Sequence, residues 1–182
     1  MVAATQRITV EEFERLASRP ANVDRRLEFI AGEVVELVPH QYCSQIAGRI
    51  IVRLGAFVEQ HNLGYYSVPD GGFKIGDNRV MPDVAFVSNT RQTTPSHETW
   101  ASVVPDLAIE IISPSDRVKD VTNKIAIYLA AGVTVWLIDP EDHTLTIHKS
   151  GEAPQTWGPD DGVHGEDQLA GFTLVIKDIF PE

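Results

Sequence analysis

The chain of 182 residues is 43% hydrophobic and 23% charged, a composition typical of an ordinary globular protein with one domain. Its formal net charge of −11 argues against a generally basic surface, the usual mark of nucleic-acid binding, although a few Lys and Arg can still gather in one cleft. A single cysteine excludes an intramolecular disulfide framework, and no apolar run approaches the roughly 20 residues that cross a bilayer. We therefore expect one soluble, cytoplasmic domain over residues 1–182, with no membrane partner.

The first half of the chain predicts two helices and a series of short strands. Thr9 followed by Glu12 has the capping-box spacing that begins a short helix. The alternating stretch "RRLEFIAGEVVELVP" indicates a β-hairpin. Apolar residues at helical spacing predict the longest helix over about 41–61, and three short β-type runs follow at 64–70, 71–77 and 79–88. A polar, proline-bearing surface loop is expected over 90–100.

The second half predicts a βαβ unit. "PDLAIEIIS" reads as a core strand, a helix capped by Ser113 or Ser115 runs to Gly132, and "VTVWLIDP" forms the next strand. The two strands should be parallel, with a right-handed crossover. Together with the antiparallel hairpins they predict an α/β (α+β) fold, a mixed β-sheet flanked by helices on both faces.

Two acidic residues stand out in these strands. Asp83 follows Pro82 at the head of the apolar run "VAFV", and Glu110 interrupts the core strand "PDLAIEIIS", where Asp106 shares its face. A carboxylate in such a strand is costly to bury unless a partner or a cation compensates its charge. Two carboxylates on neighbouring strands could converge on one Mg²⁺, which prefers oxygen ligands. Asp106 is a possible further ligand or simply the start of the strand.

A lysine follows on the predicted helix. Val121, Ile125 and Tyr128 form its inward stripe, and Lys124 borders that stripe, so its amine could reach the edge of the sheet. An ammonium there would favour a deprotonated attacking water and stabilise negative charge in a phosphoryl transition state.

Several segments now carry a family resemblance. "MPDVAFVS", "PDLAIEIISPSDR", "NKIAIYLAAGV" and "VWLIDP", in this order and spacing, resemble the Uma-two family of endonucleases in the PD-(D/E)XK nuclease superfamily. The match extends over nearly the whole chain, from "EFIAGEVVEL" to "GFTLVIKDIF". The resemblance implies a restriction-endonuclease-like fold.

It also implies roles for individual residues. Asp83 matches the aspartate of the first half-motif, and Glu110 matches the acid of the second. The usual lysine two positions later is replaced by Ile112, and Lys124 on the following helix would take its place. Glu28 matches an additional N-terminal acid that completes the metal site.

The implied activity is hydrolysis of phosphodiester bonds in DNA with Mg²⁺ or Mn²⁺. Asp83 and Glu110 would bind the metal, with the Ile112 carbonyl as a further ligand. Lys124 would orient or activate the water, and Glu28 would tune the metal or hold a bound water. Many nucleases of this fold are homodimers, so a homodimer is a possible assembly.

The predicted long helix contains one residue that departs from the family pattern and three that could extend the site. Cys43 stands where many relatives have a histidine, which leaves activity open; the cysteine itself is expected to pack as a small residue. Gln45, Arg49 and Arg53 could approach the cleft or a phosphate.

Each site residue also has a simpler interpretation. Asp83 could cap a backbone N–H at a turn, and Glu110 could form a buried ion pair with an arginine. Lys124 could be a solvated helix lysine, and Glu28 an acid on a strand surface. Three functions therefore stay open: an active endonuclease, an inactive nuclease-fold protein that binds nucleic acid or a protein, and a structural module that docks through "GFTLVIKDIF".

Overall fold

The computed structural model describes residues 7–181. Its helices are α1 (Val10–Ala17), α2 (Gln41–Gln60) and α3 (Val118–Ala130), with short 3-10 helices at Pro20–Asn22, Asp167–Leu169 and Ile176–Ile179. Its strands are β1 (Leu27–Ile30), β2 (Glu33–Glu36), β3 (Gly64–Ser67), β4 (Gly72–Ile75), β5 (Asn78–Val80), β6 (Val84–Ser88), β7 (Trp100–Ala101), β8 (Leu107–Ile111), β9 (Thr134–Asp139), β10 (Thr144–His148), β11 (Gln155–Trp157), β12 (Gly162–His164) and β13 (Thr173–Val175).

The strands form two main sheets where the sequence predicted one. A six-stranded sheet has the order β11-β10-β9-β8-β6-β3, and a five-stranded sheet has the order β2-β1-β5-β4-β7. β8 and β9 are parallel and joined by α3, which confirms the predicted βαβ unit. β6 and β8 are antiparallel, with Val84 opposite Ile109. The mixed α+β architecture is as expected, and the hairpin β1–β2 belongs to the second sheet.

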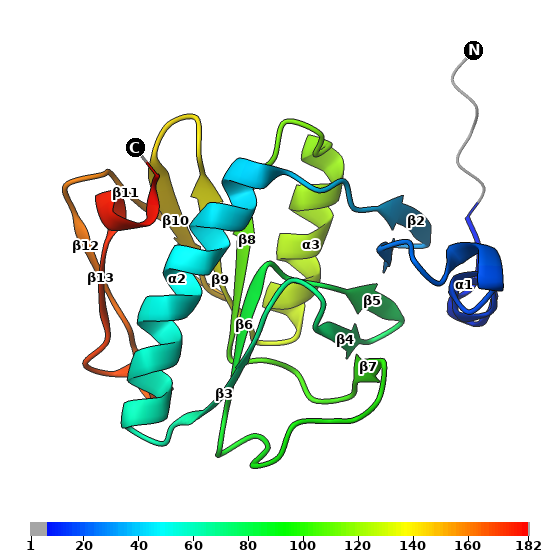
Figure 1. Ribbon diagram of the computed structural model, residues 1–182, viewed down its shortest axis with the longest axis horizontal. Helices are drawn as coiled ribbons and strands as arrows, with labels where there is room; N and C mark the ends of the chain where they lie inside the picture. The colour runs from blue at the N-terminus through cyan, green and yellow to red at the C-terminus, as the bar shows by residue number, and fades with distance from the viewer. Residues whose placement is uncertain (1–6, 182) are drawn as a thin grey trace.

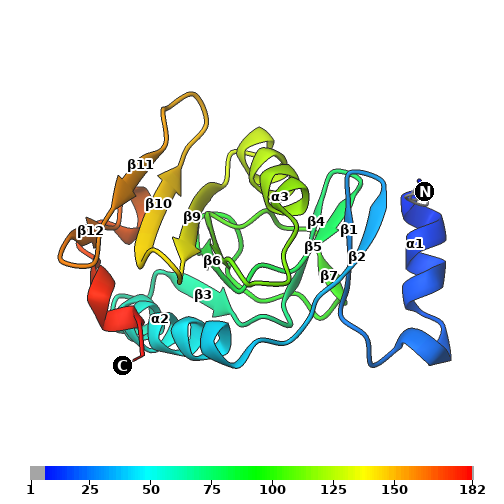
Figure 2. The same ribbon diagram turned by 90° about the horizontal axis from the view of Figure 1, so that it is seen from above.

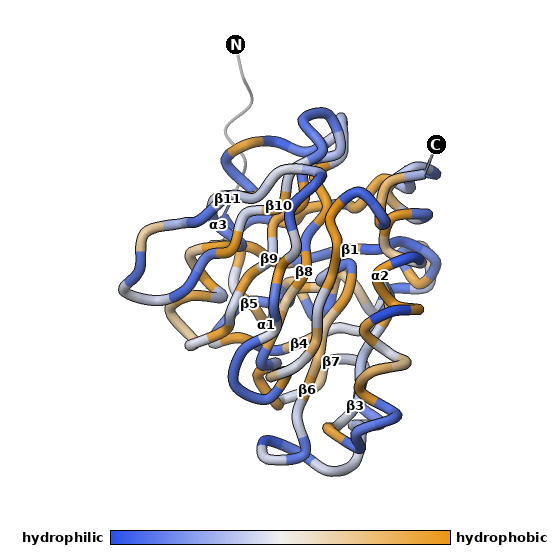
Figure 3. The backbone as a smooth tube through the Cα atoms, turned by 90° about the vertical axis from the view of Figure 1, so that its left-hand side faces the viewer, coloured by the Kyte–Doolittle hydropathy of each residue, from blue (hydrophilic) through white to orange (hydrophobic). Residues whose placement is uncertain are grey.

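The six-stranded sheet is covered on both faces. Figures 1 and 2 show α2 on one side of it and α3 on the other, with the five-stranded sheet beside α3 and α1 outermost. Along β6, Val84 and Phe86 pack in the core under α2, whereas Ala85 and Val87 pack in the core that includes Tyr128 of α3. This double burial explains the continuous apolar run of β6. Figure 3 shows apolar stretches gathered along the central strands and hydrophilic stretches in peripheral loops.

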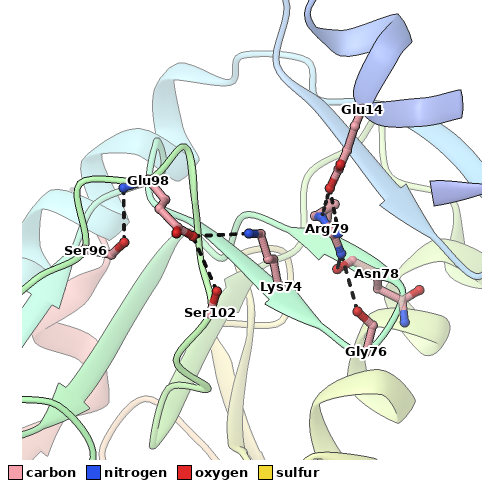
Figure 4. Close-up of polar contacts among 8 residues, drawn as sticks. All are labelled: Glu14, Lys74, Gly76, Asn78, Arg79, Ser96, Glu98 and Ser102. Atoms are coloured by element: carbon pink, nitrogen blue, oxygen red, sulfur yellow. Dashed lines mark hydrogen bonds and ion pairs between the residues drawn. The ribbon is translucent and has the colours of Figure 1, made fainter. Parts of the chain in front are cut away.

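Local signals explain most of the helix and turn boundaries. The Thr9 side chain accepts from the Glu12 N–H at 3.2 Å and the Glu12 carboxylate accepts from the Thr9 N–H at 2.8 Å, so the predicted capping box is present. Gly132, at φ +74°, follows the end of α3, where a left-handed residue favours glycine. Arg79 joins α1 to the five-stranded sheet through Glu14, with 2.6 Å between Nη2 and Oε1 (Figure 4).

Two expectations about local structure were wrong, and a third, the loop at 90–100, is confirmed except at its last residue. α3 begins after Arg117 rather than after a serine cap, because the hydroxyls of Ser113 and Ser115 bond to each other at 2.8 Å. The expected loop at 90–100 ends in β7, where Trp100 pairs with Gly72. The segment "GFTLVIKDIF" is not a free docking strand, because it packs into the core under α2 through five buried residues: Phe172, Leu174, Ile176, Ile179 and Phe180.

Within residues 7–181, no helix combines the length and the apolar character needed to span a bilayer.

Candidate active site

One cleft of about 770 Å³ is lined by all five of the main catalytic and metal-binding residues that the sequence predicted. Its walls come from β1, the segment before α2, the start of α2, the start of β6, the end of β8 and the first turns of α3. The predicted residues among its lining are Glu28, Asp83, Glu110, Ile112 and Lys124. The chain therefore brings together residues that are widely separated in the sequence.

Asp83 lies immediately before β6, at the end of that strand which faces the end of β8. Its Oδ2 atom accepts a hydrogen bond from the Ile111 N–H at 2.8 Å. This bond ties the two strand ends together beyond the last ladder pair, Val84 with Ile109. Asp83 thus does cap a backbone N–H, as its simpler interpretation expected, while its carboxylate also lines the cleft.

Glu110 projects from β8 toward α3. The alternation of the strand places Leu107, Ile109 and Ile111 in the core under α2, so Glu110 faces the opposite side. There its Oε2 atom lies 2.8 Å from the Lys124 Nζ, and its Oε1 atom accepts from the Tyr128 hydroxyl at 2.8 Å. The partner of Glu110 is therefore a lysine and a tyrosine from one helix, not the arginine that its simpler interpretation proposed.

Lys124 lies at the centre of the buried face of α3 rather than at its border. The buried residues of this helix are Asp120, Lys124 and Tyr128, which follow one another at a spacing of four. The Lys124 side chain is 9% exposed, so it is not a solvated helix lysine. Sequence reasoning missed Tyr128 as a polar partner, although its position one turn after Lys124 was a usable signal.

Glu28 on β1 completes the cluster from the five-stranded sheet. Its Oε1 atom lies 3.0 Å from the Lys124 Nζ and accepts from the Met81 N–H at 2.6 Å. Its residue is 0% exposed, which excludes the surface acid of the simpler interpretation. Within the described residues its Oε2 atom is buried and has no hydrogen-bond partner. A buried carboxylate oxygen left in this way indicates room for a further donor or cation.

The protonation behaviour of the cluster follows from burial and from the shortage of positive charge. Burial raises the pKa of Glu110 to about 8, although Lys124 acts in the opposite direction. Burial likewise raises the pKa of Asp83, against the effects of Lys124 and the Ile111 N–H. Burial alone would lower the pKa of Lys124, but the carboxylates of Glu110, Glu28 and Asp83 raise it above its usual value. Lys124 therefore stays a cation at neutral pH.

These donors fit a hard divalent cation. Glu28 and Glu110 share the ammonium of Lys124, and Asp83 lines the same cleft, so the cluster carries excess negative charge when all three carboxylates are ionised. Among residues 7–181, no group of three or more His, Cys, Asp and Glu side chains is arranged to hold a metal ion by itself. The predicted set needs only two such side chains, Asp83 and Glu110, with the Ile112 carbonyl. Mg²⁺ often binds proteins through one or two carboxylates and completes its shell with water and phosphate.

Cys43 lies beside this predicted donor set. It is a buried core residue, as expected, and its Sγ atom lies 3.6 Å from the Ile112 carbonyl oxygen and 3.2 Å from the Nδ1 atom of His40. Burial raises the pKa of the Cys43 thiol to about 11, and the carboxylates of Asp83 and Asp116 act in the same direction. The thiol is therefore protonated at neutral pH and is a poor nucleophile.

Other candidates from the sequence lie elsewhere. The Asp106 carboxylate accepts from the Ser88 N–H at 2.7 Å and pairs with Arg91 at 2.7 Å, outside the large cleft. Asp106 is therefore not a ligand of the predicted metal site. Arg49 and Arg53 on α2 also do not line the cleft, because Arg49 donates to the carbonyl oxygens of Asp178 and Phe180. Gln45 is likewise absent from the lining.

Comparisons with known proteins identify the fold and the family of the chain. The chain resembles a crystallised protein from Anabaena variabilis ATCC 29413, described as a putative nuclease belonging to DUF820, with a TM-score of 0.83 and 24% sequence identity. The similarity covers 95% of this chain and 97% of that one, so the two proteins share a fold. A search of curated proteins found no match. The model of the Uma2 family, described as "Putative restriction endonuclease", matches residues 10–177, and the chain belongs to this family.

Proposed function

We propose that this protein is a metal-dependent endonuclease that hydrolyses phosphodiester bonds of DNA. The observation that carries the proposal is the excess of carboxylates on the wall of one cleft, where Glu28 and Glu110 pair with the ammonium of Lys124 and Asp83 lies on the same wall. Membership of a family described as restriction endonucleases supports the same reaction class. A purely structural ion pair would need one carboxylate for one ammonium, whereas this cluster has an excess of carboxylates.

Asp83, Glu110 and the Ile112 carbonyl would hold Mg²⁺ or Mn²⁺. When bound, such an ion polarises a phosphoryl oxygen and supplies a water of lowered pKa. The protein's own groups prepare that site. The Ile111 N–H orients Asp83, and the Tyr128 hydroxyl and Lys124 hold the two oxygens of Glu110 in place.

The protonation state of Lys124 limits the role that it can have in the proposed reaction. Because its pKa lies above the usual value, it is a poor general base at neutral pH. Its ammonium is instead suited to orient a water and to stabilise negative charge that develops on the phosphate. Glu28 holds this ammonium and, through the Met81 N–H, the segment that leads into Asp83. We therefore assign Glu28 a positioning role.

The test is cleavage of plasmid and single-stranded DNA by the purified protein, with Mg²⁺ or Mn²⁺ and then with EDTA. We expect cleavage of at least the single-stranded DNA, and we expect that this cleavage requires the metal and that Asp83→Asn abolishes it. The matched control is Asp160→Asn, which makes the same chemical change at a residue with an 89% exposed side chain outside the cleft. Equal cleavage by both variants would refute the proposed site. Metal binding without cleavage by the unmodified protein would favour an inactive nuclease-fold protein.

A homodimer, in which each site takes one strand, stays a prediction of the family resemblance. Analytical ultracentrifugation with and without DNA measures it directly.

A further inference from the structure

The charges that line the cleft are unusual for a site that receives a polyanion. Three cationic side chains line it against six carboxylates, so the wall carries a net negative charge when all are ionised. The cations are Arg26, Arg117 and Lys124, and the carboxylates are Glu28, Glu36, Asp83, Glu110, Asp116 and Asp120. A duplex presents one negative charge per about 1.7 Å of its axis and would be repelled by such a wall.

The cations of the wall are also already paired. Arg26 forms an ion pair with Asp70, with 3.2 Å between Nε and Oδ1 but without hydrogen-bond geometry, and its Nη2 atom donates to the Pro69 carbonyl oxygen at 2.6 Å. Arg117 lies 2.6 Å from Asp120, between Nε and Oδ2. Lys124 is held by the two buried glutamates described above. An approaching phosphate would therefore have to compete with an acid of the same chain for each cation.

The neighbouring surface offers no substitute. Arg25 lies 2.5 Å from Glu36, and Lys119 lies 2.6 Å from Glu33, so the cations beside the mouth are neutralised too. The lining contains no Phe, Tyr or Trp, the side chains on which proteins stack the bases of a single strand. The cleft thus has neither a basic track for successive phosphates nor an aromatic platform for bases.

The size of the cleft sets the remaining limit. Its volume of about 770 Å³ lies within the range of roughly 300–1,000 Å³ that is common for small-molecule sites. A short piece of a nucleic-acid strand can enter such a space.

We propose that this protein engages its substrate at the reacting phosphodiester alone, and that its substrates are short oligonucleotides and single strands rather than duplex. This inference rests on the proposed function and narrows it. Its physical consequence is that activity depends weakly on salt, because few counterions are released when one phosphate is bound.

The first experiment compares hydrolysis of a dinucleotide, a long single strand and a long duplex, with kcat/KM expressed per phosphodiester bond. We expect the dinucleotide and the single strand to be hydrolysed equally well. Between about 50 and 200 mM salt, one phosphate contact predicts a fall of roughly threefold, against about 10³- to 10⁵-fold for six to ten contacts. A strong preference for the duplex, or a fall of the larger size, would overturn the inference while leaving the proposed nuclease intact. Hydrolysis no greater than that of Asp83→Asn on all three substrates would overturn both.

The second experiment adds the missing cationic surface. Asp70→Asn with Glu36→Gln releases Arg26 and Arg25, and both acids are exposed at the surface, with 82% and 48% of the side chain accessible. With two more phosphate contacts, kcat/KM on the long single strand should rise at low salt and fall roughly 18-fold between about 50 and 200 mM. The dinucleotide, which has no additional phosphates to contact, should be unaffected.

The matched control makes the same change in net charge away from the cleft. Glu98→Gln with Asp160→Asn releases Lys74, which Figure 4 shows beside Glu98, and Lys177. We expect this variant to behave like the unmodified protein. Equal gains in the two double variants would mean that overall charge rather than the paired cations of the cleft limits binding, which would overturn the inference.

Discussion

The acidic residues at the two ends of strand β8 differ in their partners and in the balance of charge around them. Before the strand begins, the Asp106 carboxylate accepts from the Ser88 N–H and pairs with Arg91, whose side chain is 34% exposed. Near its other end, Glu110 is held by a lysine and a tyrosine that are both buried, and two further carboxylates line the same cleft. Asp106 is paired with one accessible cation and a backbone N–H, whereas at the other end two acids contact one ammonium and a third acid lines the same cleft.

This contrast shows that an imbalance of charge, rather than the presence of an acid in a core strand, identifies the candidate site. An ion pair of one acid and one cation at the surface contributes little to stability and needs no further cation. An unmatched buried cluster costs free energy unless another cation joins it. A variant at Asp106 can therefore serve as the control for the corresponding variant at Glu110.

The largest expected effect is on catalysis. Glu110→Gln should lower kcat/KM by about 1,000-fold or more, since removal of a single stabilising group in an active site already costs about 10²- to 10³-fold. Asp106→Asn keeps an oxygen that can accept from the Ser88 N–H and should retain nearly full activity. Steady-state hydrolysis with Mn²⁺ measures both. Similar losses in the two variants would show that the difference between the ends of β8 is not functional.

The next effect is on stability. Lys124→Ala leaves Glu28 and Glu110 buried without a cation and should lower the free energy of unfolding by about 3–5 kcal/mol. Arg91→Ala removes the accessible partner of Asp106 and should cost about 1 kcal/mol or less. Urea denaturation of both variants, without metal, measures the difference. Equal decreases in the free energy of unfolding would mean that Lys124 contributes no more to stability than Arg91 does.

Two tyrosine variants compare a buried hydrogen bond to an acid with an exposed one. Tyr128→Phe deletes a buried hydrogen bond to Glu110 and should cost about 1–3 kcal/mol, the usual range when a buried polar group loses its partner. Tyr66→Phe deletes the same type of bond to an exposed acid, Glu59, at 2.9 Å, and should cost less. Thermal denaturation ranks the two variants, and the reverse order would contradict the assigned role of Tyr128.

The last prediction concerns the dependence of stability on pH. The pKa of Glu110 is about 8 in the folded protein, above the usual value of 4.5, so between these pH values the folded state retains a proton that the unfolded state has lost. The free energy of unfolding should therefore fall as the pH rises from about 4.5 to about 8, by up to about 1.4 kcal/mol per pH unit. Glu110→Gln should flatten this slope. Denaturation series at several pH values in EDTA provide the measurement, and an unchanged slope would assign it to another group.

Much of this fold was predictable because local signals decide it. The capping box at Thr9, the helical spacing of α2 and the βαβ unit around α3 all depend on neighbouring residues, and the structure contains all three. The division into two sheets was not predictable, because it depends on pairing between distant strands such as β1 and β5. β7, with two residues, is too short to leave a pattern.

The candidate site shows the same limit. Strand and helix patterns selected Asp83, Glu110 and Lys124, and the family resemblance added Glu28. These side chains do line one cleft, although their roles stay predictions. Apolar periodicity misplaced Lys124 at the border of its helix, because a buried lysine does not count as apolar. The polar role of Tyr128 was missed because an aromatic residue on an inward stripe is counted as apolar core, and its hydroxyl is then not considered.

The wide separation of these side chains along the chain bears on how the protein folds. Glu28, Asp83, Glu110 and Lys124 come from four different elements, and the first of them lies on a strand that pairs with β5, not with the six-stranded sheet. During synthesis from the N-terminus, Glu28 and Asp83 emerge long before the lysine that neutralises them. Closing such long loops is slow, so we expect the charged cluster to form late, after α2 and the hairpin β1–β2.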